Sequence, residues 1–396
     1  MTLALLALTI GAFAIGTTEF VIVGLMPTIA NDLSVTLPSA GLLVSFYALG
    51  VAVGAPLLTA ITGNVGRKTL LVSLMVLFTL ANLAAWCAPG YDTLVIARIF
   101  SGLAHGVFFS VGSIIATNMV AKDKEASAIA TMFSGLTVAF VTGVPLGTFV
   151  GQHFGWRVTF LMVAAFGLIA LISALVFVPR HIANPPAASL RQQAELFLQP
   201  RLLLVFAMTI VGYGGSLVAF TYLAAILQET AGFSPSVVGL VLLLYGASVA
   251  VGNMLGGKLA DLHGPIVALK LIFALLAGVL FLLEFTATNK ALVIAVVLAW
   301  GAVAFGNVPA LQVYVVKQAE RFAPHSVGVA SGMNIAAFNL GVAGGAWTGG
   351  AAVDHLGLMS TPWIGGLVVL CALGLTWVSG RIDQRDLRQD LATDLP

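Results

Sequence analysis

The sequence predicts an all-α integral membrane protein with twelve transmembrane helices in two pseudo-symmetric six-helix bundles. Of its 396 residues, 60% are hydrophobic and only 8% are charged, and the mean hydropathy is +1.07, which no soluble domain needs. Apolar stretches of about 20 residues recur along the whole chain, and each is long enough to cross a bilayer core of roughly 30 Å. The chain also matches itself at an offset of 198 residues, which is half its length.

The internal match places residues of the same type in register. The clearest pairs are Gly41 and Gly239, Leu42 and Leu240, Tyr47 and Tyr245, Val51 and Val249, Gly54 and Gly252, and Gly66 and Gly264. One half-unit therefore occurs twice. A duplicated membrane bundle with its binding site between the copies is the architecture of a secondary transporter.

The twelve spans are expected in chain order, six in each half. They are 3–30, 37–62, 69–88, 92–119, 126–152, 156–178, 201–230, 234–260, 266–287, 291–316, 326–353 and 359–380. The halves are thus expected at 1–178 and 201–380. A polar, proline-bearing linker at 179–200 and a charged tail at 381–396 are both expected in the cytoplasm.

The basic residues predict the orientation. If both termini lie in the cytoplasm, all of the 17 Lys and Arg residues except Arg98, Arg157 and Lys290 are on that side, as the positive-inside rule requires. The net charge of +2 therefore reflects topology, and it gives no reason to expect a nucleic-acid partner.

Glu19 lies halfway along the first span, in the segment Gly16-Thr-Thr-Glu-Phe20. A charge inside the membrane is costly, so it indicates function by default. Low dielectric disfavours the ionised form of a carboxyl group, so we expect Glu19 to take up and release a proton. The alternative is a neutral carboxyl group held by hydrogen bonds between helices.

Arg98 and His105 lie in the fourth span, two helical turns apart on nearly the same face. The guanidinium of Arg98 cannot be neutralised and needs a carboxylate, carbonyl groups or water. We expect it to tune the proton affinity of Glu19 or to stabilise its ionised form. His105 could bind substrate or relay a proton, or it could be structural.

Polar and aromatic side chains elsewhere in the spans are candidates for the wall of a substrate cavity. They are Thr18, Tyr47, His105, Tyr222, Tyr245, Asn307, Asn334, Phe338 and Asn339. Aromatic surface with a few hydrogen-bonding groups suits amphipathic molecules. Each Tyr and Asn could instead make an interhelical hydrogen bond. In the fifth span, Gly143, Pro145 and Gly147 predict close helix packing and a kink.

These elements together resemble the major facilitator superfamily, specifically its twelve-span drug:proton antiporters. The family's loop motif after the second span, Gly-x-Leu-Ala-Asp-x-x-Gly-Arg-Lys, is matched at its end by Gly66-Arg67-Lys68, and a fuller copy is Gly257-Lys-Leu-Ala-Asp261-Leu-His-Gly264. The resemblance implies that Arg67, Lys68 and Asp261 stabilise one conformational state.

Two further segments carry the resemblance. The segment Arg98–Gly102 is similar to the family's fourth-span motif, whose arginine is linked to proton transfer. Gly143-Val-Pro145-Leu-Gly147 is similar to the antiporter signature of the fifth span, with a role in shaping the interface between the halves.

Within the superfamily, the chain resembles the bacterial branch labelled arabinose-efflux or chloramphenicol-resistance type. Gly16–Phe20, Gly102-Leu-Ala-His105-Gly106 and Asn334–Gly341 carry this resemblance. It implies a monomer in the bacterial inner membrane. The members of this branch handle drugs, sugars and nucleosides.

The function expected is proton-coupled export of small amphipathic drug-like molecules by alternating access. A proton-coupled sugar or nucleoside exporter and, more distantly, a non-transporting membrane sensor remain alternatives. We find no metal-ligand cluster, nucleophile with a paired base, or phosphate-binding loop. We therefore expect no enzyme activity, metal or cofactor, with the proton gradient as the energy source and the small molecule, protons and lipid bilayer as the partners.

Overall fold

The computed structural model describes residues 3–393 except 63, 181 and 183–189. Within these residues all regular secondary structure is helical, and twelve helical segments are long and apolar enough to cross a membrane. The first half contains α1 (Leu3–Asp32), α2 (Leu37–Ile61), α3 (Arg67–Trp86), α4 (Tyr91–Asn118), η1 (Lys122–Lys124), α5 (Glu125–Val138), η2 (Ala139–Gly143), α6 (Val144–Phe154) and α7 (Trp156–Phe177).

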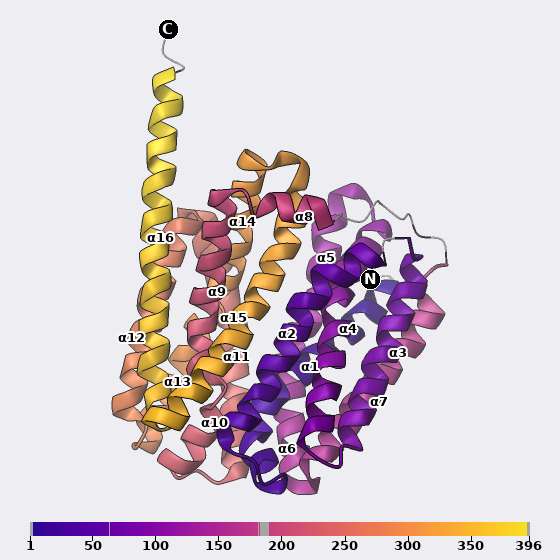
Figure 1. Ribbon diagram of the computed structural model, residues 1–396, viewed down its shortest axis with the longest axis vertical. Helices are drawn as coiled ribbons and strands as arrows, with labels where there is room; N and C mark the ends of the chain where they lie inside the picture. Colours follow the sequence, from indigo (N-terminus) through magenta and orange to yellow (C-terminus); the bar gives the residue numbers. More distant parts are fainter. Residues whose placement is uncertain (1–2, 63, 181, 183–189, 394–396) are drawn as a thin grey trace.

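The second half follows a short helix, α8 (Leu190–Leu196). It contains α9 (Pro200–Phe220), α10 (Leu223–Ala225), η3 (Ile226–Thr230), α11 (Pro235–His263), α12 (Pro265–Thr286), α13 (Lys290–Ala304), α14 (Asn307–Phe322), η4 (Pro324–Ser326), α15 (Val327–Leu356) and α16 (Ser360–Thr393). The prediction of twelve spans is confirmed. In Figure 1 the two halves lie side by side, with the first half in indigo to magenta and the second in pink to yellow.

Glycine makes the tightest connections between spans possible. Gly155, Gly264 and Gly357 lie between consecutive helices and have φ angles of +90°, +81° and +87°. Only glycine adopts such angles without a steric cost. A single residue therefore connects the helices at Gly155 and at Gly264, and Gly357 begins a three-residue connection to α16. Proline then starts α12 at Pro265, where its missing N–H costs nothing.

Three spans are interrupted, whereas the sequence predicted only a kink at Pro145 in the fifth span. The fifth span contains the π-helical turn η2 just before Pro145. A proline ring clashes with the carbonyl group four residues earlier, and a π-turn absorbs this conflict. The seventh span breaks at Thr221–Tyr222, and the tenth breaks at Phe305–Gly306.

The halves meet where α2 packs against α15, where α11 packs against η2 and α6, and where α1 contacts α10. Ser45 of α2 donates a hydrogen bond to the carbonyl oxygen of Ala343 in α15 at 2.9 Å. Helix α8 contacts both α2 and α15, and Gln193 donates to the carbonyl oxygen of Pro56 at 3.3 Å. In Figure 1, α8 lies across the upper end of the bundle, and the C-terminal end of α16 extends beyond it.

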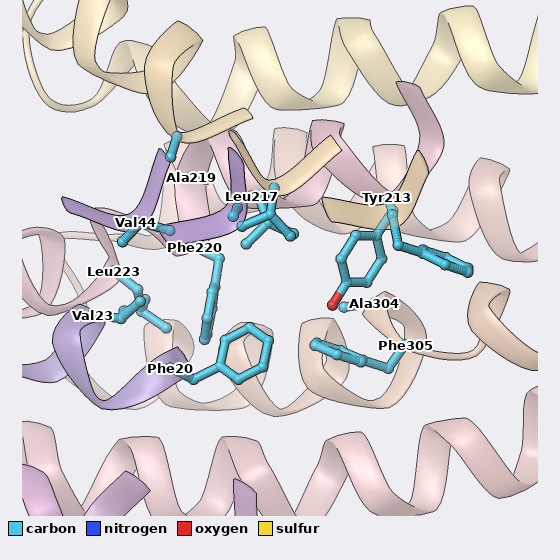
Figure 2. Close-up of a cluster of buried hydrophobic side chains, with 14 of the residues drawn as sticks. Phe20, Val23, Val44, Tyr213, Leu217, Ala219, Phe220, Leu223, Ala304 and Phe305 are labelled. Carbon is cyan, nitrogen blue, oxygen red and sulfur yellow. The ribbon is translucent and has the colours of Figure 1, made fainter. Parts of the chain in front are cut away.

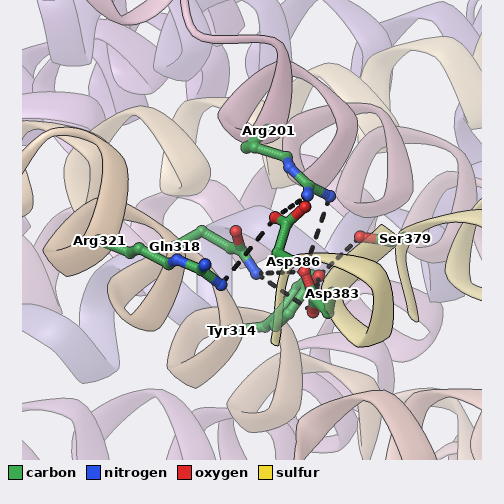
Figure 3. Close-up of polar contacts among 7 residues, drawn as sticks. All are labelled: Arg201, Tyr314, Gln318, Arg321, Ser379, Asp383 and Asp386. Carbon is green, nitrogen blue, oxygen red and sulfur yellow. Dashed lines mark hydrogen bonds and ion pairs between the residues drawn. The ribbon is translucent and has the colours of Figure 1, made fainter. Parts of the chain in front are cut away.

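The last helix differs from the expectation. The sequence predicted a span ending near residue 380 and a solvated tail, but α16 continues to Thr393. The reason is electrostatic, because Asp383 and Asp386 are paired with arginines of α9 and α14 (Figure 3). The first turns of the expected tail therefore pack as part of the second half.

Candidate functional site

Glu19 lies in the middle of α1, the helix with the largest buried share among the twelve spans. Its side chain is nearly inaccessible, since the residue is 8% exposed. Its Oε2 atom lies 3.9 Å from Nδ1 of His105. A carboxylate at this depth is separated from bulk water and faces a titratable ring, which is an arrangement suited to exchanging a proton.

Tyr47 and His105 complete this contact. The Tyr47 hydroxyl group lies 2.9 Å from His105 Nδ1, so the same nitrogen faces the hydroxyl and the carboxylate. Tyr47 comes from α2, His105 from α4 and Glu19 from α1, so three helices of the first half build the site. The sequence named all three residues, and the fold brings them together.

Arg98 is buried beside them, with only 1% of its surface exposed. Its Nη1 donates to the carbonyl oxygen of Thr18 at 2.8 Å and lies 3.2 Å from the Thr18 hydroxyl oxygen. Its guanidinium carbon lies 4.1 Å from the centre of the Tyr47 ring. Among the described contacts, Arg98 therefore binds Thr18, the residue before Glu19. The Glu19 carboxylate lies within ion-pair distance of His105.

Two polar residues of this region, Asn82 and Ser101, were not predicted from the sequence. Thr18 donates to Asn82 Oδ1 at 2.8 Å, and Asn82 Nδ2 donates to the Ser101 hydroxyl oxygen at 3.2 Å. These bonds connect α1, α3 and α4 through Thr18, the residue that Arg98 contacts. The available signal was a lone amide in the apolar third span, because a buried amide needs partners.

Phe20 extends the site toward the second half. Its ring centre lies 4.2 Å from that of Phe140 in η2, 6.4 Å from Phe220 in α9 and 6.3 Å from Phe305 at the break of the tenth span. Tyr213 packs against Phe305 at 5.4 Å. Figure 2 shows the rings of Phe20, Phe220, Phe305 and Tyr213 turned toward one another. Glu19 and Phe20, one of these packed rings, are therefore consecutive residues of α1.

Two more predicted cavity residues join this cluster. Phe338 packs edge-on against Tyr213 at 5.1 Å, and Tyr245 stacks on Phe220 at 5.0 Å. The aromatic cluster is defined here as Phe20, Phe140, Tyr213, Phe220, Tyr245, Trp300, Phe305 and Phe338. Both halves contribute to it, so a change in their relative position must alter it.

The remaining predicted cavity residues lie elsewhere. Tyr222 is fully buried between the halves, because its hydroxyl oxygen approaches Gly41 of α2 and Gly350 of α15. Asn334 accepts a hydrogen bond from Thr209 at 2.7 Å and donates to Gln312 at 3.0 Å, which links α9, α14 and α15.

Two asparagines donate hydrogen bonds to carbonyl groups three or four residues earlier in the same span. Asn307 donates to the carbonyl oxygen of Ala304 at 2.9 Å, across the break of the tenth span. Asn339 donates to the carbonyl oxygen of Ile335 at 3.0 Å, one turn earlier in α15. In both side chains Oδ1 is buried without a hydrogen-bond partner in the described part of the chain.

The glycines of the fifth span pack directly against the turn that carries Glu19. A Cβ atom on Gly143 would collide with the Thr17 side chain, and one on Gly147 would lie 2.6 Å from Val21. Pro145 lies between them at the start of α6. This segment, predicted to shape the interface, therefore holds α1 on both sides of Glu19.

The loop residues with an expected conformational role are outside the site. Lys68 Nζ donates to the carbonyl oxygens of Leu175 and Val178 at 2.7 and 2.6 Å, which joins α3 to the end of α7. Arg67 is buried at the start of α3. Asp261 lies exposed near the end of α11.

A second polar cluster, also missed from the sequence, lies near the end of the second half that carries the extension of α16 (Figure 3). Arg201 of α9 is paired with Asp383 and Asp386, and Arg321 Nη1 lies 3.9 Å from Asp386. Tyr314 of α14 donates to Asp383 at 2.8 Å. These contacts fasten α16 to α9 and α14 and do not reach Glu19.

Comparison with known proteins is consistent with this architecture. A family model described as Major Facilitator Superfamily matches residues 8–331. The Bacillus subtilis protein YtbD, named an uncharacterized MFS-type transporter, is 51% identical over 386 residues, which cover 98% of this chain and 97% of YtbD. The Escherichia coli K12 inner membrane transport protein YdhP is 41% identical, with coverage of 95% and 96%.

A more distant relative and a solved structure complete the comparison. The putative transporter AraJ of Escherichia coli K12 is 33% identical and covers 88% of each chain. A crystal structure of a bacterial homologue of the human lysosomal transporter Spinster, in an inward-facing and occupied conformation, shares the fold. It has a TM-score of 0.77 at 17% identity, with coverage of 95% and 96%. The chain belongs to the major facilitator superfamily and is a multi-pass membrane transport protein, not an enzyme.

Proposed function

We propose that this transporter is a proton-coupled exporter of small amphipathic aromatic molecules that works by alternating access. The observation that carries the proposal is the adjacency of Glu19 and Phe20. Glu19 faces His105 at 3.9 Å, and Phe20 enters a cluster of rings from both halves. A solute bound between the halves would therefore act directly on the turn that binds the proton.

The coupling follows from the cost of a buried charge. With Glu19 protonated, its carboxyl group adds no buried negative charge while the halves rock. When the site opens to the side of lower proton concentration, the carboxyl group loses its proton, and Arg98 at the Thr18 carbonyl group stabilises the ionised form at short range. Solute bound to the open, ionised form is then exported when a proton from the other side replaces it.

The aromatic cluster supports an apolar substrate. Its eight rings offer stacking surface, and the Trp300 N–H is already bonded to Ser216 at 2.8 Å. A sugar would need many more hydrogen-bonding groups than the remaining tyrosine hydroxyls provide. We further propose that the protein acts as a monomer in the bacterial cytoplasmic membrane, with both termini in the cytoplasm and without a cofactor. The name of YdhP as an inner membrane protein supports that location.

The test uses everted membrane vesicles in which respiration acidifies the lumen and an acridine dye reports the pH gradient. Chloramphenicol, tetraphenylphosphonium, arabinose and a purine nucleoside are added in turn. We expect dequenching with one of the first two compounds, because its transport into the lumen is coupled to the movement of protons out of the lumen. Glu19→Gln should abolish dequenching at equal membrane content.

The matched control is Glu284→Gln, the same change in a carboxyl group of α12, away from the site. It should retain the wild-type response. Dequenching that survives Glu19→Gln would refute the role of Glu19, and a response to arabinose or the nucleoside alone would refute the substrate class.

A further inference from the structure

The two halves carry a tyrosine at equivalent places in their folds. Tyr47 and Tyr245 are paired by the repeat, and the same contacts surround their backbones. Gly102 of α4 packs against the carbonyl oxygen of Tyr47, and Gly301 of α13 packs against that of Tyr245. These contacts fix the register between α2 and α4 in one half and between α11 and α13 in the other.

The register shows what replaces the polar site in the second half. Moving from Gly102 to Gly301 is a step of 199 residues (301 − 102), and the same step leads from Arg98 to Val297 and from His105 to Ala304. Val297 and Ala304 are both buried. The second half therefore keeps the tyrosine but has lost the guanidinium and the imidazole around it.

The two tyrosine hydroxyl groups consequently differ. The Tyr47 hydroxyl bonds to His105 at 2.9 Å. The Tyr245 hydroxyl is buried and has no hydrogen-bond partner among the described residues. The indole N–H of Trp300, whose ring packs against Tyr245, donates to Ser216 instead. A phenylalanine would fill the same space without burying an unsatisfied polar group.

The surroundings of Tyr245 indicate what could satisfy it. Its ring stacks on Phe220 with centres 5.0 Å apart and an interplanar angle of 23°, and Trp300 lies edge-on at 5.8 Å. Phe220 in turn faces Phe20 of the other half at 6.4 Å. A solute that bound between Phe20 and Phe220 would lie one ring away from Tyr245, and rotation of the Phe220 side chain would expose the hydroxyl group to it.

We infer that the second half contains a substrate subsite in which the Tyr245 hydroxyl donates a hydrogen bond to an acceptor on the aromatic solute, such as a carbonyl or nitro oxygen. One copy of the repeat thus carries the proton site, and the other has become the apolar subsite with a single donor. This inference rests on the proposed function, and it narrows the preferred substrates to aromatic molecules that carry an acceptor.

The test compares two probes in Tyr245→Phe, a change that removes only the hydroxyl oxygen. Chloramphenicol carries nitro and amide oxygens, whereas tetraphenylphosphonium carries no acceptor. Calorimetric titration of the purified full-length protein should show chloramphenicol binding weakened about tenfold, the equivalent of one hydrogen bond. Tetraphenylphosphonium affinity should stay within about twofold, and the melting temperature should not fall, because no internal bond is lost.

Tyr314→Phe is the control for a hydroxyl group with internal partners. Tyr314 bonds to Ser379 and Asp383, so this variant should melt lower and show no preference between the probes. A lower melting temperature for Tyr245→Phe, an equal loss for both probes, or unchanged chloramphenicol affinity would overturn the inference. So would a wild-type protein that binds only tetraphenylphosphonium. Failure of the wild-type protein to bind either probe would instead refute the proposed substrate class, and the inference with it.

Discussion

Gly106→Ala tests whether the geometry of the proton site depends on the close crossing of α2 and α4. A Cβ atom at Gly106 would lie 2.6 Å from the carbonyl oxygen of Val51 and 2.7 Å from the amide nitrogen of Ala55. Both are backbone atoms, so no side-chain rotation relieves the clash. An ordinary contact of at least 3.4 Å requires α4 to move away from α2 by about 0.8 Å, the difference from 2.6 Å.

This displacement acts on the neighbouring residue. His105 Nδ1 lies 2.9 Å from the Tyr47 hydroxyl, and a shift of about 0.8 Å would lengthen that bond beyond useful geometry. Overpacking costs about 1–3 kcal/mol, partly offset by about 1 kcal/mol of helix propensity gained on replacing glycine by alanine. We therefore expect net destabilisation of up to about 2 kcal/mol together with impaired transport.

The assay is thermal unfolding in detergent beside vesicle dequenching. For a unit the size of one six-helix half, each kcal/mol lowers the melting temperature by about 2–4 °C. Gly278→Ala is the control, because nothing lies within 4 Å of a Cβ atom at this position of α12. It should melt at or above the wild-type temperature and transport normally. If Gly106→Ala melted like Gly278→Ala, the backbone contact would not constrain the site.

Three further variants probe other contacts. Arg98→Lys should restore almost none of the vesicle dequenching lost in Arg98→Ala, because an ammonium group cannot reproduce the planar contacts with Thr18 and the Tyr47 ring; wild-type activity of the lysine variant would contradict this. Arg201→Ala should expose the end of α16 to proteinase K, because Asp383 and Asp386 lose their principal cation. Arg381→Ala, at an exposed position, should not. Equal cleavage rates in the two variants would show that the ion pairs of Arg201 do not hold α16 in place. Phe20→Ala should weaken binding of the exported compound several-fold, since stacked rings contribute about 0.5–1.5 kcal/mol each beyond burial, and unchanged affinity by calorimetry would exclude Phe20 from the substrate site.

The spans could be predicted because membrane thickness sets their length and the bilayer excludes unpaired backbone groups. The breaks within spans were harder. The tenth span has a glycine and a proline close to its break, Gly306 and Pro309. The seventh span breaks at Thr221 and Tyr222, and neither of these residues is a glycine or a proline. Tyr222 is held between α2 and α15, so tertiary packing overrides local helix propensity there.

The candidate site could be predicted in part. Glu19, Arg98 and His105 were visible because a polar or ionisable group inside a membrane span is rare and needs a reason. Their partners depend on which helix faces meet, and periodicity within one helix cannot reveal this. Asn82 reaches Thr18 only because α1 and α3 meet there. The paired aspartates of α16 were interpreted as a solvated tail because their partner, Arg201, is 185 residues from Asp386.

Proton release on substrate binding would report the coupling between proton and solute without a membrane gradient. Purified protein in weakly buffered detergent, near the pH at which Glu19 exchanges its proton, receives the compound that dequenches the vesicles, while a pH indicator records released protons. We expect the wild-type protein and Glu284→Gln to release up to one proton per bound molecule. Glu19→Gln should bind the compound and release none. Equal release by Glu19→Gln, or binding without release in the wild-type protein at every pH, would contradict the claim that Glu19 couples the proton to the solute.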